Sequence, residues 1–588
     1  MNVVGINYGH NASVTLSMDG KIVFSLAEER PSRLKNYTGF PEQAYRIMLD
    51  QWLDGNIDNI DRFVVPATTT ICYLHFHKYN QFDQHKYSNY FKYDGPPKVH
   101  KSIKSGNYRY FRWYEWKDKI NFKRLAHKSS LWENFVKIIM EHSGVQRERL
   151  MFINHHDAHA YSAALNLQSD NAPALIFTLD GSGDYLCASV SEFKENKVSS
   201  LSRNIRYPSP GIFYRQITGF LGMKPDEHEF KVMGLAPYAS NKLVKEVYDK
   251  FAPLFWVNDK LEFESLFPME YMKDFLVWNC TFDRFDLIAA AAQQLLEDRV
   301  CEWIGKWIEK TRIKRLGLAG GVFMNVKLNQ KIAEMSEVDD LFVVPSAGDE
   351  SLGMGCCYYG TTLNENKAKI SPVKDLYLGI SHSNEEIEKY LSAPDISNKF
   401  TVSKEEDITG RIAKLLAEGN AVGNFAGRDE WGARALGNRS LLADPRSRDT
   451  IRIINEMIKG RDFWMPFTPS ILSECLPEYI INPKSIKSPY MAITFNSTEK
   501  GRELFQAAVH PYDFTMRPQA VYKEWNPRYH DLISKFKDIT GVGGVLNTSL
   551  NLHGLPNVFN LEDAIHLLEN SSLKYLVIED WLVTKKED

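Results

Sequence analysis

Residues 3–29 read VVGINYGHNASVTLSMDGKIVFSLAEE, and residues 174–193 read ALIFTLDGSGDYLCASVSEF. The first stretch predicts a strand, a polar turn at residues 10–12, a second strand, a turn at Asp19-Gly20 and a third strand. In the second stretch an apolar strand ends at Asp180, a Gly/Ser turn follows, and another strand leads away. Because this strand-turn-strand unit occurs twice, with a polar residue at the end of its first strand, we expect an α/β fold of two similar halves around a cleft.

The bulk composition narrows the class of protein. The chain has 588 residues, 44% hydrophobic and 25% charged, and a net charge of −3. This length favours at least two domains, and the proportions of hydrophobic and charged residues argue against both disorder and a membrane protein. The near-neutral charge predicts no nucleic-acid partner, and we interpret the basic run around Lys117 to Lys128 as a solvated face. Dispersed cysteines without a C-x-x-C pair, and an N-terminus that starts in a strand-like run, indicate a cytoplasmic protein with no membrane association.

A polar, proline-bearing region around residues 362–403 indicates a domain boundary. We therefore expect a first domain at 1–370, a linker region at 371–403 and a second domain at 404–588, which opens with a helix at 408–419 and a strand at 421–427. The first domain should also contain a long helix from Asp286 to Lys310. An aromatic and basic stretch from His75 to Lys128 is either a surface excursion or part of an acceptor-binding wall.

Residues 153–159, INHHDAH, suggest a metal site in the first domain. On a helix, His155 and His159 would share one face, and Asp180 and Asp349 each follow a predicted strand. Two imidazoles and two carboxylates suit Fe(II), Mn(II) or Zn(II), although two unrelated histidines would show the same spacing. His10, in the first turn, is a candidate general base, and a purely structural histidine is the alternative.

The sequence RLGLAGGVFMNVKLN at 315–329 predicts a strand that enters a Gly-Gly turn before a helix. Such a turn brings backbone N–H groups close to phosphate oxygens. We therefore interpret Gly320, Gly321 and Asn325 as a phosphate loop of the first domain.

The second domain contains four short sequence motifs rich in polar residues, here called words, at residues 427–446, 458–470, 510–519 and 546–558. Cations and short polar side chains recur in them, as a nucleotide triphosphate requires. The alternative is a buried ion-pair network with Asp429, Glu430 and Asp444. The basic residues of these words are Arg428, Arg434, Arg439, Lys459, Arg461 and Arg517, and the neighbouring polar residues are Asn438, Asn547, Thr548, Ser549 and Asn551.

Taken jointly, the words resemble the ATP-dependent O-carbamoyltransferases of the nodulation-factor and tobramycin type. The resemblance covers nearly the whole chain. It rests on GHNAS, AEERPSRLKNYTGFP, HHDAH, LDGSGD, EFKVMGLAPYA, LAGGVFMN, SAGDES, WGARALGNRSLLADPR, MRPQ and LNTSLNLHG. It implies a first domain similar to actin, heat-shock chaperone ATPases and sugar kinases, and a second, YrdC-like α/β domain.

The resemblance also implies a reaction. The second domain would make carbamoyl-adenylate from carbamoyl phosphate and ATP with Mg²⁺, and the first would transfer the carbamoyl group to a hydroxyl of a small, natural-product-like acceptor at a mononuclear metal, Fe(II) or another divalent ion. The metal ligands carry over onto His155, His159, Asp180 and Asp349, and the base onto His10. The adenylate-binding positions carry over onto Arg434, Lys459, Arg517 and Ser549.

Two positions depart from the family pattern. Met465 stands where an arginine often precedes Pro-Phe, so that Arg461 is a candidate replacement, and Asn11 follows His10 where relatives often have aspartate. Three rival functions remain: a threonylcarbamoyl transferase acting on tRNA, a sugar-kinase-like or chaperone-like ATPase, and a non-catalytic nucleotide-binding module. A homodimer is expected only from the general frequency of symmetric pairs.

Overall fold

The computed structural model describes residues 1–69, 97–106, 108, 111, 129–167, 172–239, 241–363, 370–460 and 462–586. The chain forms two compact units. The first comprises Met1–Val23 and Asn36–Pro372, and the second comprises Phe24–Lys35 and Val373–Asp588. Most of the stretch from His75 to Lys128, and the candidate phosphate ligand Arg461, lie outside the described residues.

The N-terminal strands form a five-stranded sheet with the order β3-β2-β1-β4-β5. Strand β1 runs antiparallel to β2 and parallel to β4, and β4 runs parallel to β5. The first three of these strands are largely buried, and the two predicted turns join them. The strands are β1 (Asn2–Asn7), β2 (Ser13–Met18), β3 (Lys21–Ala27), β4 (Arg62–Val65) and β5 (Leu150–Phe152).

A second five-stranded sheet repeats this arrangement with the order β8-β7-β6-β11-β12. Here β6 runs antiparallel to β7 and parallel to β11, and β11 runs parallel to β12. The duplication predicted from the two strand-turn-strand stretches is therefore present. The strands are β6 (Ala174–Gly183), β7 (Leu186–Lys194), β8 (Lys197–Ile205), β11 (Arg315–Ala319) and β12 (Asp340–Val343).

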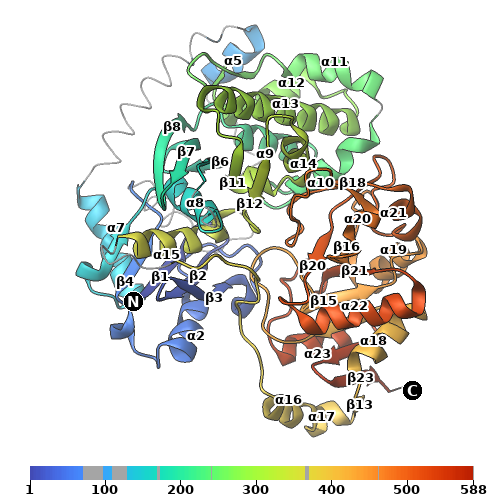
Figure 1. Cartoon of the computed structure of the whole chain (residues 1–588). Coiled ribbons are helices and arrows are strands. Elements are labelled where there is room, and N and C mark those ends of the chain that lie inside the picture. The colour runs from blue at the N-terminus through green and yellow to red at the C-terminus, as the bar shows by residue number, and fades with distance from the viewer. Residues whose placement is uncertain are drawn as a thin grey trace. The chain divides into compact units, whose positions relative to one another are not determined.

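Helices α8 (His155–Ala164) and α15 (Leu352–Thr362) pack against each other between these sheets (Figure 1). Helix α15 contacts β1, and α8 contacts β6 and β11. Their close crossing depends on small residues, because a Cβ at Gly355 would lie 1.8 Å from the carbonyl oxygen of Ala158. This packing fixes α8 beside the end of β6.

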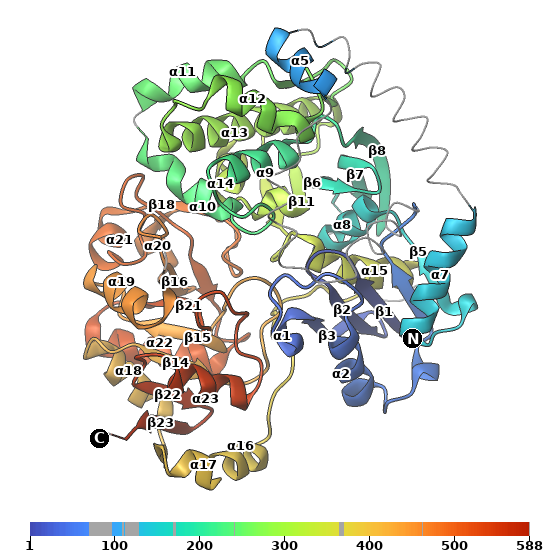
Figure 2. The same cartoon turned by 180° about the vertical axis from the view of Figure 1, so that it is seen from behind.

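Other helices cover the second sheet of this unit. The longest is α13 (Phe285–Thr311), which agrees with the helix predicted from Asp286 to Lys310. It packs against α11 (Asn241–Phe251) and α9 (Pro210–Phe220), and α9 also contacts β6. Figure 2 shows α9, α11 and α13 from the opposite side.

The second unit is built on an eight-stranded sheet with the order β13-β23-β22-β14-β15-β21-β16-β20. Helix α18 (Ile408–Ala417) packs on α22 (Pro527–Thr540), and helix α23 (Leu561–Glu569) contacts β22. The predicted helix at 408–419 and strand at 421–427 are thus α18 and β14. The strands are β13 (Phe400–Lys404), β14 (Val422–Phe425), β15 (Arg439–Ala443), β16 (Thr468–Leu472), β20 (Gln519–Val521), β21 (Gly544–Ser549), β22 (Tyr575–Ile578) and β23 (Trp581–Lys585).

The mixture of helices and strands in both units confirms the predicted α/β class. Within the described ranges, no helix is both long enough and apolar enough to span a lipid bilayer. The likeness of the first unit to actin and of the second to YrdC stays a prediction.

Candidate functional site

Two of the three histidines of the INHHDAH word, His155 and His159, point from α8 toward two aspartates. The Asn154 side chain accepts a hydrogen bond from the His156 N–H and so caps the helix. His155 Nε2 lies 3.4 Å from Asp180 Oδ2 and 3.5 Å from Asp349 Oδ1. His159 Nε2 lies 3.2 Å and 3.5 Å from the same two atoms. All four ligand atoms lie within 4.8 Å of one another, which is the arrangement predicted from the sequence.

Each aspartate comes from a chain segment that follows or ends a strand. Asp180 lies near the end of β6, where the pairing with β7 shifts register between Leu179 and Gly183. Asp349 begins the short helix η6 (Asp349–Ser351), which leads into α15. Strand pairing and the α8–α15 contact therefore hold the four ligands from three separate segments.

The electrostatics of this cluster favour a cation. Burial disfavours ionisation of Asp180, but hydrogen bonds from His155 and His159 outweigh it and hold the pKa of Asp180 well below its usual value. Burial likewise opposes protonation of His155, yet the carboxylates of Asp349 and Asp180 raise its pKa to about 9. The carboxylates thus stabilise positive charge at the position where a divalent ion would bind.

Asp184 anchors the start of α8. Its carboxylate accepts hydrogen bonds from the His155 N–H at 2.9 Å and from Asn154 Nδ2 at 3.2 Å. It also accepts from the Thr68 N–H and hydroxyl and from the Thr69 hydroxyl. This carboxylate is therefore engaged in orienting the helix that carries His155 and His159.

Ser351 contacts the ring nitrogen of His159 that faces away from the aspartates. The distance from His159 Nδ1 to Ser351 Oγ is 3.3 Å, and both residues are fully buried. Such a contact orients an imidazole and selects which nitrogen is available for a metal.

His10 lies in the turn between β1 and β2. The Ser13 hydroxyl donates to the Glu350 carbonyl at 3.1 Å, so this turn adjoins the segment that carries Asp349. Among the described residues, His10 Nε2 is buried without a hydrogen-bond partner. Asn11 has a φ of 57°, a conformation that asparagine and aspartate both tolerate well.

The Gly-Gly turn packs tightly against the end of β6. Gly320 has a φ of 101°, and a Cβ there would lie 2.4 Å from the Leu179 carbonyl oxygen. The Asn325 side chain accepts from the Leu328 N–H and so caps α14 (Val326–Glu334). The close approach to Leu179 explains why residue 320 is a glycine, and the helix cap explains the asparagine at 325. A phosphate-binding role for Gly320, Gly321 and Asn325 stays a prediction.

In the second unit, strand order brings the polar words to one end of the sheet. The end of β21 pairs with the starts of both β15 and β16, with Ser549 opposite Ser440 and Asn547 opposite Thr468. Strand β20 runs parallel to β16 and starts at the same end. The segments that carry Arg434, Lys459 and Arg517 each precede one of these strands, so all the words converge there.

Lys459 is buried at the centre of a polar cluster. This residue ends the π-helix η7 (Asn455–Lys459) and is 2% exposed. Its ammonium group donates to Asn551 Oδ1 at 2.6 Å and to Ser549 Oγ at 3.2 Å. Two residues that the sequence could only group by composition therefore contact the same lysine.

The remaining predicted nucleotide ligands fall into two groups. Asn547 is fully buried, and its Nδ2 donates to the Ala435 carbonyl and to the Ser470 hydroxyl, which ties β21 to the segment after Arg434. Arg434 and Arg517 are half-buried, in the segments before β15 and β20. A nucleotide-binding role for these residues is a prediction.

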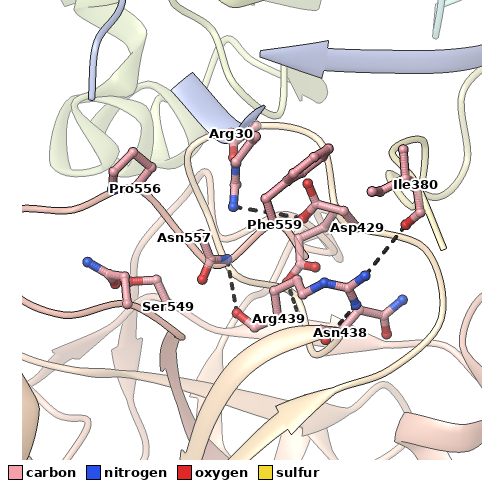
Figure 3. Close-up of polar contacts among 12 residues, drawn as sticks. Arg30, Ile380, Asp429, Asn438, Arg439, Ser549, Pro556, Asn557 and Phe559 are labelled. Carbon is pink, nitrogen blue, oxygen red and sulfur yellow. Dashed lines mark hydrogen bonds and ion pairs between the residues drawn. The ribbon is translucent and has the colours of Figure 1, made fainter. Parts of the chain in front are cut away.

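Arg428 and Arg439 serve the fold. Arg439 is completely buried, stacks on the Phe425 ring at 3.6 Å and donates to the carbonyls of Ala426 and Gly427. Figure 3 shows that it also contacts the Ile380 carbonyl and that its own carbonyl accepts a hydrogen bond from Asn557. Arg428 donates to the carbonyls of Leu378 and Gly379. Backbone carbonyls, and not the carboxylates of the ion-pair alternative, accept these hydrogen bonds of the two guanidinium groups.

Asp184 and Ser351 were not singled out from the sequence. The aspartate lies in the LDGSGD word four residues after Asp180, so its proximity to the site could have been inferred. Its contact with the first turn of α8 depends on the register shift in β6 and could not.

Models of known families match both parts of the chain. The model "Carbamoyltransferase N-terminus" matches residues 2–357, and "Carbamoyltransferase C-terminus" matches residues 413–585. The chain belongs to the carbamoyltransferase family. It is therefore a transferase enzyme, as the resemblance predicted.

Individual relatives of this carbamoyltransferase extend over most of its length. Nodulation protein NolNO of Sinorhizobium fredii is 28% identical and matches 98% of this chain and 79% of its own. The 3'-hydroxymethylcephem-O-carbamoyltransferase of Amycolatopsis lactamdurans is 28% identical over 54% of this chain and 59% of its own. A protein of Methanocaldococcus jannaschii is 32% identical, and both chains are covered completely. A crystal structure of T. kodakarensis HypF matches 61% of this chain and 47% of its own, with 12% identity and a TM-score of 0.32.

Proposed function

We propose that this enzyme makes carbamoyl-adenylate from carbamoyl phosphate and ATP in its second unit and transfers the carbamoyl group to a hydroxyl of a small-molecule acceptor in its first. The observation that carries the proposal is the pairing of two sites in one carbamoyltransferase. One is the Lys459–Ser549–Asn551 cluster at a shared end of a sheet, and the other is the His₂Asp₂ cluster beside the turn of His10.

The first reaction needs cations and hydrogen-bond donors around phosphates. Carbamoyl phosphate is hydrolysed to carbamate and phosphate, and a carbamate oxygen then attacks the α-phosphorus of ATP with release of pyrophosphate. Lys459, Arg434 and Arg517, together with Mg²⁺ bound to ATP, neutralise the charge of the transferring group. The carbamate and the mixed anhydride are both labile in water, so the proposed reaction requires that bulk water be kept from them once they form.

The second reaction moves the carbamoyl group from AMP to the acceptor hydroxyl. His10 accepts the hydroxyl proton as the oxygen attacks the carbamoyl carbon, and AMP leaves. Two imidazole nitrogens and two carboxylate oxygens within 4.8 Å fit Fe(II) or another divalent ion. When bound by His155, His159, Asp180 and Asp349, such an ion supplies Lewis-acid activation of an oxygen of the transferred group.

Product analysis separates this proposal from its main rival. Incubation with ATP, Mg²⁺ and carbamoyl phosphate, without acceptor, should yield carbamoyl-AMP and pyrophosphate. A kinase-like or chaperone-like ATPase would release ADP and phosphate instead. A transferase that acts on tRNA would shift bulk tRNA at moderate salt, whereas the proposed enzyme would not.

A further inference from the structure

The segment Phe24–Lys35 is part of the second unit, although the residues on both sides of it in the sequence belong to the first. It contains the short helix α1 (Glu29–Ser32) and two arginines, Arg30 and Arg33. The segment belongs to the AEERPSRLKNYTGFP word, to which neither reaction above gives a role.

Arg30 fixes the segment to the loop before β15. Its side chain is 5% exposed and lies 3.8 Å from Asp429, whose side chain is 2% exposed (Figure 3). The guanidinium group also donates to the Gly432 carbonyl at 3.2 Å. This contact fixes the segment that also carries Arg33.

Arg33 holds the loop between β21 and α23. Its Nη1 donates to the Asn557 carbonyl at 2.6 Å, and its Nη2 donates to the Pro556 carbonyl at 3.1 Å. Its Nε lies 3.2 Å from Asp563 Oδ1 on α23. All three nitrogens of the planar guanidinium group thus engage one loop and the helix that follows it.

The same loop carries Asn551. The Val558 N–H donates to the Leu550 carbonyl at 2.9 Å, which closes the loop at its base. Asn551 Nδ2 donates to the Leu552 and Leu555 carbonyls inside the loop, while its Oδ1 accepts from Lys459. Arg33 and Asn551 also line one cavity of about 210 Å³.

These contacts link Arg33 to Lys459 through the backbone of the loop of residues 550–558 and the hydrogen bonds of Asn551. We propose that Arg33 is a positioning residue for ATP in the second unit, acting through the loop of residues 550–558 on Asn551 and Lys459. The inference rests on the proposed function. It adds that the adenylating unit needs a segment supplied from near the N-terminus.

Steady-state kinetics of the full-length protein test the role of Arg33. For Arg33→Ala, the KM for ATP in pyrophosphate release should rise about tenfold or more, because displacement of the loop misplaces Asn551. Arg33→Lys keeps a charged donor and should recover part of that loss. Arg46→Ala, which removes a side chain 73% exposed on α2 (Glu42–Trp52), should leave the KM unchanged. An unchanged KM in a folded Arg33→Ala protein would overturn the inference.

A double-mutant cycle separates positioning from general stabilisation. If Arg33 acts through Asn551, the combined Arg33→Ala/Asn551→Ala variant should have nearly the KM of Asn551→Ala alone. Additive effects would contradict the inference. If Arg33→Ala does not fold, Asp563→Asn gives a milder test, with an expected rise of about threefold in KM, and no change in that KM would count against the inference.

Comparison with Lys459→Ala and with the unmodified protein distinguishes failure of this inference from failure of the proposed function. A normal KM in Arg33→Ala beside a raised KM in Lys459→Ala would reject only the role of Arg33. Absence of pyrophosphate from the unmodified protein would reject the proposed function and this inference together.

Discussion

Gly183 and His155 are so close that the glycine has no room for a side chain. A Cβ at Gly183 would lie 2.1 Å from Cδ2 of the His155 ring, well inside van der Waals contact. The glycine lets the bulged end of β6 approach α8, and this approach places Asp180 beside His155 and His159.

Gly183→Ala should therefore displace the His155 ring and weaken binding of a divalent metal about tenfold or more. Gly181→Ala is the matched control, because a Cβ there meets no atom within 4 Å. Metal affinity is measured by competition with a chelator of known strength. Equal affinities in the two variants would show that the His155 position does not limit binding.

Asp184→Asn tests whether the start of α8 sets the ligand geometry. The change replaces one oxygen that accepts hydrogen bonds with a donor, so the N–H and hydroxyl groups around Asp184 can no longer all be satisfied. We expect a loss of about tenfold to a hundredfold in metal affinity and an altered absorption spectrum of the Co²⁺-loaded protein. Asp339→Asn, at a side chain 69% exposed, should change neither.

Lys459→Ala should reduce the rate of pyrophosphate release about a hundredfold or more, because a charge placed at the transferring phosphate disappears. Arg434→Ala should show a loss of similar size. Lys500→Ala provides the control, since that lysine is 52% exposed in a surface ion pair with Glu478. Near-normal rates in both Lys459→Ala and Arg434→Ala would show that the adenylation site lies elsewhere.

Arg439→Ala should lower the free energy of unfolding of the second unit by about 3 kcal/mol, because it leaves buried carbonyls without their donor. Arg452→Ala removes a side chain 64% exposed and should change stability by less than about 0.5 kcal/mol. Hydrogen exchange of peptides from β14 and β15 reports on this unit separately. Full protection of these peptides in Arg439→Ala would contradict a structural role.

The sequence predicted the elements whose signal is local. Alternating apolar residues located β1, β2 and β3, periodicity located α13, and residues at strand ends suggested the proximity of Asp180 and Asp349 to His155 and His159. The strand and helix inferences need only the period of an element and the direction in which its side chains point. The grouping of Asp180 and Asp349 with the two histidines rested also on the family resemblance.

The remaining features depend on tertiary register. Arg434 and Arg439 occur in one word with similar composition around them, yet only the fold shows that Arg439 stacks on Phe425 and binds carbonyls. Likewise, nothing local in the sequence assigns Arg33 to a loop more than 500 residues away. Long-range contacts of this kind follow from strand order, which the periodicity of single elements does not specify.

The most direct test of the account is mass spectrometry of the purified protein incubated with ATP, Mg²⁺ and carbamoyl phosphate in the absence of acceptor, with Arg434→Ala alongside. The proposed function predicts carbamoyl-AMP and pyrophosphate from the unmodified protein and loss of both from Arg434→Ala. Formation of ADP and phosphate, with no carbamoyl-AMP, would contradict the proposed chemistry.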